Sequence, residues 1–414
     1  MTAEDPVHSL PVATRATRLV TCLQDLHAGP LVLAEIISLG ETAIAPLEVF
    51  LRGASQSLYH PRALAVDALA AIGGDNSIAA LIRALRDSIA RKLDALRNEA
   101  EDVVISRIVE HLSEYGGPAV TEAILDALRA RPYPACARAL GQVGDARAIP
   151  LLVHCLYEDA ARNAAMESLR RCGPAAVADL RAALATPSFV YGMEAPTHID
   201  GRIAATTLLG ELGDRDSLIR ALDDRQRSVR IAAALGLAAG RSEVPGRAIE
   251  LLLDGLDDPD WARVQTIMEA LMNVGPSIVD LLGKILTQDA TDEGSQRRRR
   301  HAAVLAGRLG LPAAAAWLAA LSSASDSRLR LAAISALAQI GAPDERQLAQ
   351  FLADADLAVA RCAFYALQSR AGSKAGSMAR WLEFASTGQT RWERWWQARR
   401  LVAAARLSRH GRAE

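Results

Sequence analysis

One pattern of apolar positions recurs along the chain and ends each time at a glycine. The residue directly before the glycine, and those four and eight before it, are apolar or small. These offsets fall on one face of an α-helix, so the pattern predicts a helix with a buried face and a left-handed glycine cap. The closing glycines are Gly73, Gly144, Gly173, Gly213, Gly275, Gly310, Gly341 and Gly372.

A second apolar segment follows most of these glycines, as in DARAIPLL after Gly144. Neighbouring glycines lie about 30 residues apart, a spacing typical of stacked helical hairpins. Hydrophobic residues make up 50% of the chain and aromatic residues only 4%, a composition that favours helix over strand. We predict an all-α fold over residues 1–390, a right-handed α-solenoid of about ten helical hairpins with no sheet.

The position eight residues before the glycine is small in most copies, which predicts close approach of neighbouring helices there. An arginine often lies eleven residues before the glycine, sometimes with an acid nearby, such as Asp200 or Asp326. We interpret this row as a structural ladder of hydrogen bonds between repeats, with an anion-binding groove as the alternative. The arginines of the row are Arg62, Arg162, Arg202, Arg299, Arg330 and Arg361.

Three segments carry a resemblance to a known family: DSRLRLAAISALAQIG, DDRQRSVRIAAALGLA and GDARAIPLLVHCL. They resemble HEAT repeats, in particular the short bacterial type also seen in phycobilisome lyase subunits. The resemblance extends over roughly residues 31–372. It implies HEAT-like hairpins and a surface that binds other molecules.

Two segments interrupt the repeat, and such interruptions often carry function. Residues 87–115 predict an extended, charged helical hairpin, either solvated on one face or forming a ridge for a partner. Residues 186–200 predict a loop insertion that carries Phe189, Tyr191 and Met193. We predict that these three side chains contact a partner, with packing over the core as the alternative.

Arginine is also concentrated in two further places. Residues 297–300 are four arginines that follow an acidic linker, and we expect a solvated helix start there. Residues 391–414 are rich in arginine and contain Trp392, Trp395 and Trp396, which predict a C-terminal capping helix. An RNA-stacking platform and a helix for acidic surfaces are the alternatives for this tail.

No sequence motif indicates a reaction. The chain has no phosphate-binding glycine loop, no G-x-S-x-G and no H-E-x-x-H, so we expect no enzymatic activity, metal or cofactor. Its five cysteines are scattered, and we find no signal peptide or membrane span, which favours a bacterial cytoplasmic protein.

We therefore predict a non-enzymatic interaction scaffold or adaptor that binds another protein or a peptide on the concave face of the solenoid and at the loop 186–200. A lyase-like accessory protein or enzyme that cradles a small ligand such as a bilin is the first alternative. A nucleic-acid binder that uses the arginines is the second. The acidic body of the chain disfavours it, because duplex binding needs a basic face.

Overall fold

The computed structural model describes residues 11–25, 27–53, 59–91, 95–190, 193–240, 242–342 and 345–371. The chain divides into two compact units, unit 1 (Met1–Ala232) and unit 2 (Ala233–Glu414), and each is described by itself. The predicted cap at 391–414, with Trp392, Trp395 and Trp396, lies outside the described residues, as does Tyr191.

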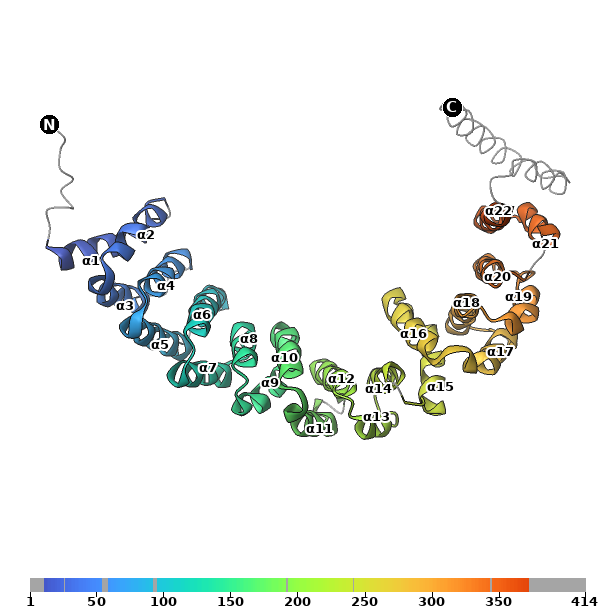
Figure 1. Cartoon of the computed structure of the whole chain (residues 1–414), viewed down its shortest axis with the longest axis horizontal. Coiled ribbons are helices and arrows are strands. Elements are labelled where there is room, and N and C mark those ends of the chain that lie inside the picture. Colours follow the sequence, from blue (N-terminus) through green and yellow to red (C-terminus); the bar gives the residue numbers. More distant parts are fainter. Residues whose placement is uncertain are drawn as a thin grey trace, which may run out of the picture. The chain divides into compact units, whose positions relative to one another are not determined.

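Unit 1 is a stack of helices in two layers (Figure 1). In one layer α2, α4, α6, α8, α10 and α12 each pack on the next, and in the other α1, α3, α5 and α7 do the same. Its elements are α1 (Val12–Cys22), α2 (Gly29–Ser38), η1 (Gly40–Ala43), α3 (Ile44–Arg52), α4 (His60–Ile72), α5 (Gly74–Ala90), α6 (Ala95–Tyr115), α7 (Pro118–Ala130), α8 (Pro134–Val143), η2 (Ala146–Ala148), α9 (Ile149–Cys155), α10 (Asp159–Cys172), η3 (Gly173–Ala176), α11 (Val177–Ala185), β1 (Phe189–Val190), β2 (Met193–Glu194), α12 (Pro196–Glu211) and α13 (Arg215–Ala221).

Helix α14 (Arg227–Ala239) spans the boundary between the units, and unit 2 repeats the helical-hairpin plan. Helices α16, α18, α20 and α22 pack in sequence, and α17 packs on α19. The elements are α15 (Gly246–Asp254), η4 (Gly255–Asp257), α16 (Trp261–Val274), η5 (Gly275–Ile278), α17 (Val279–Thr287), α18 (Glu293–Arg308), η6 (Pro312–Ala314), α19 (Ala315–Leu321), α20 (Ser327–Ile340), α21 (Glu345–Gln350), η7 (Phe351–Ala353) and α22 (Leu357–Ala371).

The helical-hairpin fold is confirmed for the described residues, with one exception. The prediction of no sheet is wrong, because β1 and β2 form a two-stranded sheet between α11 and α12. The segment expected as an extended hairpin at 87–115 contains the end of α5 and one long helix, α6, of 21 residues.

The predicted buried stripe holds at two of its three positions. The residues four before the glycine are buried, as are the small residues eight before it: Leu69, Leu140, Leu169, Leu209, Leu271, Ala306, Leu337; Ala65, Cys136, Ala165, Ala205, Ala302, Ala333. The position directly before the glycine is not buried as predicted, since Val143 is 45% exposed and the others are partly exposed. These residues end their helices, where part of their surface extends past the neighbouring helix.

Neighbouring helices approach most closely where a glycine replaces a larger side chain. A Cβ added to Gly141 in α8 would lie 2.2 Å from Oγ of Ser168 in α10. A Cβ added to Gly307 in α18 would lie 2.6 Å from Cα of Ala336 in α20. At these two positions the absence of a side chain therefore lets the neighbouring helices approach closely.

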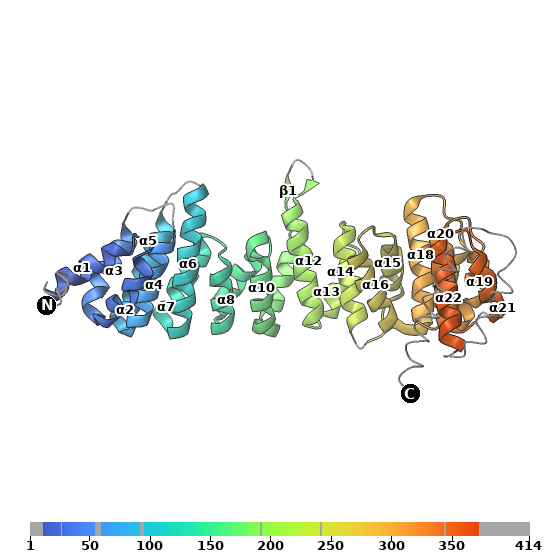
Figure 2. The same ribbon diagram turned by 90° about the horizontal axis from the view of Figure 1, so that it is seen from above.

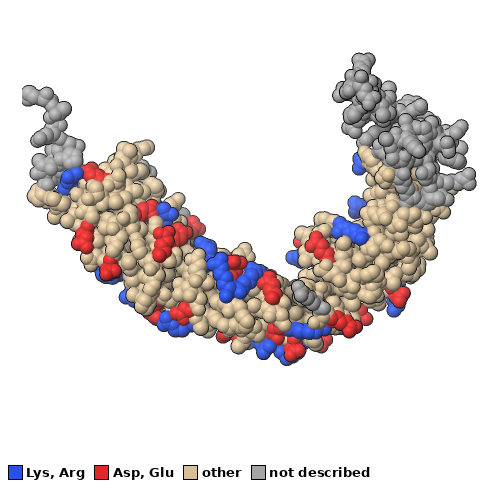
Figure 3. Space-filling model, viewed as in Figure 1, with Lys and Arg blue, Asp and Glu red and all other residues tan. Residues whose placement is uncertain are grey.

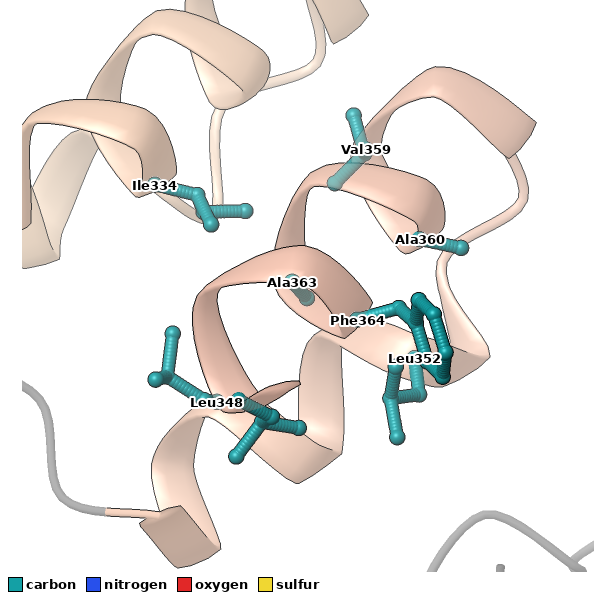
Figure 4. Close-up of a cluster of buried hydrophobic side chains, with 8 residues drawn as sticks. Ile334, Leu348, Leu352, Val359, Ala360, Ala363 and Phe364 are labelled. Carbon is teal, nitrogen blue, oxygen red and sulfur yellow. The ribbon is translucent and has the colours of Figure 1, made fainter. Parts of the chain in front are cut away.

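The core of unit 2 shows how one hairpin covers the next (Figure 4). Ile334 of α20 contributes to a cluster that is otherwise formed by α21, η7 and α22. The members of the cluster are Ile334, Leu348, Leu352, Val359, Ala360, Ala363, Phe364 and Leu367. Burial of these side chains against the preceding repeat supplies most of the stabilisation between hairpins.

Candidate interaction site

The segment that interrupts the repeat in unit 1 forms a β-hairpin. Strands β1 and β2 are antiparallel, with Phe189 opposite Glu194 and Val190 opposite Met193. Figure 2 shows the hairpin projecting at the end of α12, along one edge of the unit. The predicted loop 186–200 is shorter than expected, because α12 begins at Pro196 and both His198 and Asp200 are helical.

The alternation of side chains along β2 places one residue inward and the next outward. The side chain of Glu194 is 1% exposed, so its neighbour Met193 faces away from the helices and is 74% exposed. Phe189 is opposite Glu194 across the ladder and therefore shares its face. The guanidinium of Arg225 lies 5.9 Å from the centroid of the Phe189 ring, which is 46% exposed.

A buried ion-pair network attaches the hairpin to the helices. Arg202 of α12 donates to both carboxylate oxygens of Glu194, at 2.8 and 3.0 Å, and also to Asp224. Its Nε donates to the carbonyl oxygen of Leu184 at 3.1 Å. The Arg202 side chain is 5% exposed and that of Asp224 is 12% exposed. One guanidinium thus holds together β2, the end of α11 and the segment before α14.

An aromatic contact holds the first turn of α12 beside the hairpin. The rings of Tyr157 and His198 stack with their centroids 4.5 Å apart, and Tyr157 Oη donates to the carbonyl oxygen of Ala183 at 3.2 Å. A Cβ on Gly201 would lie 2.4 Å from Cδ1 of Tyr157, so only glycine leaves room for the ring. Burial raises the pKa of the Tyr157 hydroxyl, which therefore stays protonated.

Most arginines of the predicted ladder donate to the end of the preceding helix. Nε of Arg162 and of Arg299 donates to the carbonyl oxygens of Leu156 and Leu286, at 2.8 and 2.9 Å. Arg330 donates to Ala324 O at 2.9 Å and also reaches the following repeat, where it binds Asp354 at 2.8 Å. This arrangement satisfies carbonyl groups that a helix end leaves free.

Two members of the row differ from this arrangement. Arg62 binds the buried carboxylate of Glu101 in α6, whose oxygen is also 3.7 Å from Arg91. Burial would raise the pKa of Glu101, but hydrogen bonds from Arg62 and Ser88 and the two guanidinium charges lower it overall. Arg361 is exposed in α22, and the segment after Ala371 lies outside the described residues.

One arginine of this kind was missed by the sequence analysis. Arg230 donates to the carbonyl oxygens of Asp224 and Arg225, at 2.8 and 3.0 Å. The glycine that ends its helix, Gly240, follows ten residues later. The search for arginines eleven residues before a glycine therefore did not find Arg230. Alignment of SVRIAAALGLAA with RLRLAAISALAQ would have placed it beside Arg330.

The arginine run at the start of α18 is not a solvated helix start. Arg297 donates to Asp257 O at 2.9 Å, Arg298 lies 2.5 Å from Asp254, and Arg300 binds Asp326 at 3.1 Å. His301 Nδ1 donates to Leu256 O at 2.7 Å. The run is therefore partly buried and joins α18 to α15 and η4 on one side and to the start of α20 on the other.

Comparison with known proteins gives the kind of repeat. The PBS lyase HEAT-like repeat model matches residues 61–87 and 135–158, which contain the hairpins α4–α5 and α8–α9. Two segments of this chain are similar to the PBS lyase HEAT-like repeat. No curated protein matches the sequence.

Solved structures with HEAT-like similarity include an engineered protein, at 20% identity over 86% of this chain and 99% of that one, with a TM-score of 0.32. Kap121p bound to Pho4p is 14% identical over 85% of this chain and 47% of its own, with a TM-score of 0.39. Importin β is 15% identical over 85% of this chain and 50% of its own, also with a TM-score of 0.39. The chain thus spans about half the length of Kap121p and of importin β.

Other kinds of site were sought among the described residues. Among the described residues no group of three or more His, Cys, Asp or Glu could hold a metal ion, and no helix could cross a bilayer. The described cysteines are free thiols, and burial raises the pKa of Cys155 to about 12. Acidic and basic side chains are interspersed on the face in Figure 3.

Proposed function

We propose that this chain is a non-enzymatic scaffold that binds another protein through the β1–β2 hairpin, with Phe189 and Met193 among the contacts. The observation that carries the proposal is the exposure of Met193, 74%, on a strand whose next residue is buried in an ion pair. Large apolar side chains on a fixed surface segment are typical of interface anchors.

The anchoring of the hairpin supports this role. A binding segment that is already held in place loses less conformational entropy when a partner docks. The three carbonyl and carboxylate acceptors around Arg202 fix the hairpin against α12 and the segment before α14. The hairpin therefore presents Met193 in a defined direction before any partner is bound.

The positions of the arginines favour a protein partner over nucleic acid. Duplex binding requires several basic side chains that are available to contact phosphate groups. The most basic run among the described residues, 297–300, is engaged with carbonyl and carboxylate groups of unit 2. We further propose that the protein acts in the bacterial cytoplasm and that residues 391–414 cap the last hairpin.

The test replaces Phe189, Tyr191 and Met193 with serine and measures both melting temperature and recovery of partners from a lysate of the source cells. We expect the melting temperature to stay unchanged while specific partners are lost. Ile219→Ser is the matched control, because Ile219 is an exposed apolar residue of unit 1 on α13, 41% exposed.

A lowered melting temperature with partners retained would contradict the proposal, since the hairpin would then be part of the core. Loss of the same partners in Ile219→Ser would show that apolar surface in general, and not the hairpin, retains them. A visible chromophore that copurifies with the protein would favour the small-ligand alternative.

A further inference from the structure

We infer that Met193 is a site of reversible oxidation by hydroperoxides, and that it is the most reactive thioether among the described residues. The described thioethers differ in exposure, and most of the thiols differ from them in chemistry. Met1 and Met378 lie outside this comparison.

Exposure separates Met193 from the other thioethers. Met268 is fully buried in α16, Met166 is partly buried in α10, and Met272 is 39% exposed. Met193 is 74% exposed, and the ladder that buries Glu194 keeps its neighbour facing outward. Its exposure therefore follows from the backbone pairing of the hairpin.

Chemistry separates Met193 from the thiols. A thiol reacts with peroxide as its thiolate, whereas a thioether needs no ionisation. Cys136 and Cys155 are buried in the α8–α9 hairpin, and burial raises the pKa of both thiols. Burial raises the pKa of Cys172 and Cys362 as well, so these four stay protonated near neutral pH. The fifth thiol, Cys22 in α1, is partly exposed and lies outside this comparison.

The reaction is an oxygen transfer. A lone pair on the Met193 sulfur attacks the distal oxygen of the hydroperoxide, the O–O bond breaks, and the leaving oxygen takes up the proton as water or an alcohol. Sulfur is oxidised by two electrons and the hydroperoxide is reduced by two. The resulting sulfoxide is polar and can be reduced back by a thiol-dependent reductase.

The consequence for binding rests on the proposed function. A sulfoxide on the outward face of β2 would place a polar group where an apolar partner pocket closes over the side chain. Oxidation would then weaken partner binding without changing the fold, because Met193 makes no core contact at 74% exposure.

The experiment treats the full-length protein with limiting hydrogen peroxide and follows each sulfur by peptide mass spectrometry. We expect sulfoxide at Met193 to form about tenfold faster than at Met268, and faster than at Met272. In guanidinium the rates at Met193 and Met268 should become equal, because exposure then no longer differs. Oxidation of Met272 as fast as Met193 would overturn the inference.

A matched pair of variants separates this inference from the proposed function. Met193→Leu should remove the fast-oxidising position, whereas Met272→Leu should leave it in place. The mapping result needs no partner, so it stands or fails independently of the binding proposal. Where a partner has been recovered, peroxide should weaken its binding to wild type and to Met272→Leu but not to Met193→Leu.

Discussion

The guanidinium of Arg202 is enclosed by two carboxylates and a carbonyl oxygen in the interior of unit 1. A buried charge is costly to leave unpaired, so removal of one partner should be far more disruptive than loss of a surface ion pair. The ladder position of this arginine could be predicted from its spacing to Gly213. Its carboxylate partner could not, because Glu194 belongs to the segment that departs from the repeat.

Arg202→Ala should lower the free energy of unfolding of unit 1 by about 3–5 kcal/mol, because Glu194 and Asp224 would remain buried without a cation. Arg162→Ala is the matched control, since its partners Asp159 and Asp200 are exposed, and should cost about 1 kcal/mol. Urea denaturation measures both. Adding Glu194→Gln to Arg202→Ala should recover part of the loss, and equal losses in the two single variants would contradict this view of the network.

His301 should make unit 2 sensitive to mild acid. Burial lowers the pKa of this imidazole below its ordinary value of 6.5. The hydrogen bond to Leu256 O raises the pKa in part, and the charges of Arg300 and Arg297 lower it further. The unfolded chain therefore takes up a proton at a higher pH than the folded chain. Stability is complete above about pH 6.5 and decreases as the pH falls toward the folded value.

The measurement compares melting temperatures between about pH 7 and about pH 5 for wild type and His301→Asn. Asparagine can still donate to Leu256 O but does not titrate, so the variant should lose less stability on acidification. The same loss in both proteins would show that other groups cause the acid sensitivity.

At the scale of elements, glycine determines where helices end. All seven of the described closing glycines have positive φ, as predicted. Only some adopt the predicted left-handed form: Gly341 has φ 79° and ψ 9°, whereas Gly275 has φ 81° and ψ −157°. The second conformation is accessible almost solely to glycine, whereas asparagine tolerates the first.

Gly275→Asn should therefore destabilise unit 2 by roughly 1–3 kcal/mol, while Gly341→Asn should change its stability by a few tenths at most. The two positions belong to the same unit, so urea denaturation followed on one transition compares them directly. Similar losses at both positions would show that the difference in ψ has no energetic consequence.

The β-hairpin shows what the repeat pattern could not predict. The helical periodicity of apolar positions ends near Ala185, so it correctly predicted an interruption, but it gave no structure for the interrupting segment. The order FVYGME offered a weak local signal, since the apolar pair Phe189 and Val190 and the apolar Met193 flank a pair of residues that includes glycine. Its attachment depends on Arg202, eight residues after Glu194, and on Asp224, which follows a further helix and lies outside any local pattern.

At the scale of the whole molecule, contacts are mainly between neighbouring hairpins, and the chain divides into two units. Stability in such arrays is approximately a sum over repeats and their interfaces. We therefore expect urea to unfold the protein in more than one step. Circular dichroism, compared with tryptophan fluorescence, should give non-coincident transitions, and a single coincident transition would contradict this.

We propose above that Met193 on the β1–β2 hairpin contacts a protein partner. The most direct measurement places a photo-crosslinking amino acid at position 193, and as control at 219, and irradiates the full-length protein in its source cells. We expect a discrete protein adduct from position 193 and none from position 219. No adduct at 193, or the same adducts from both positions, would contradict it.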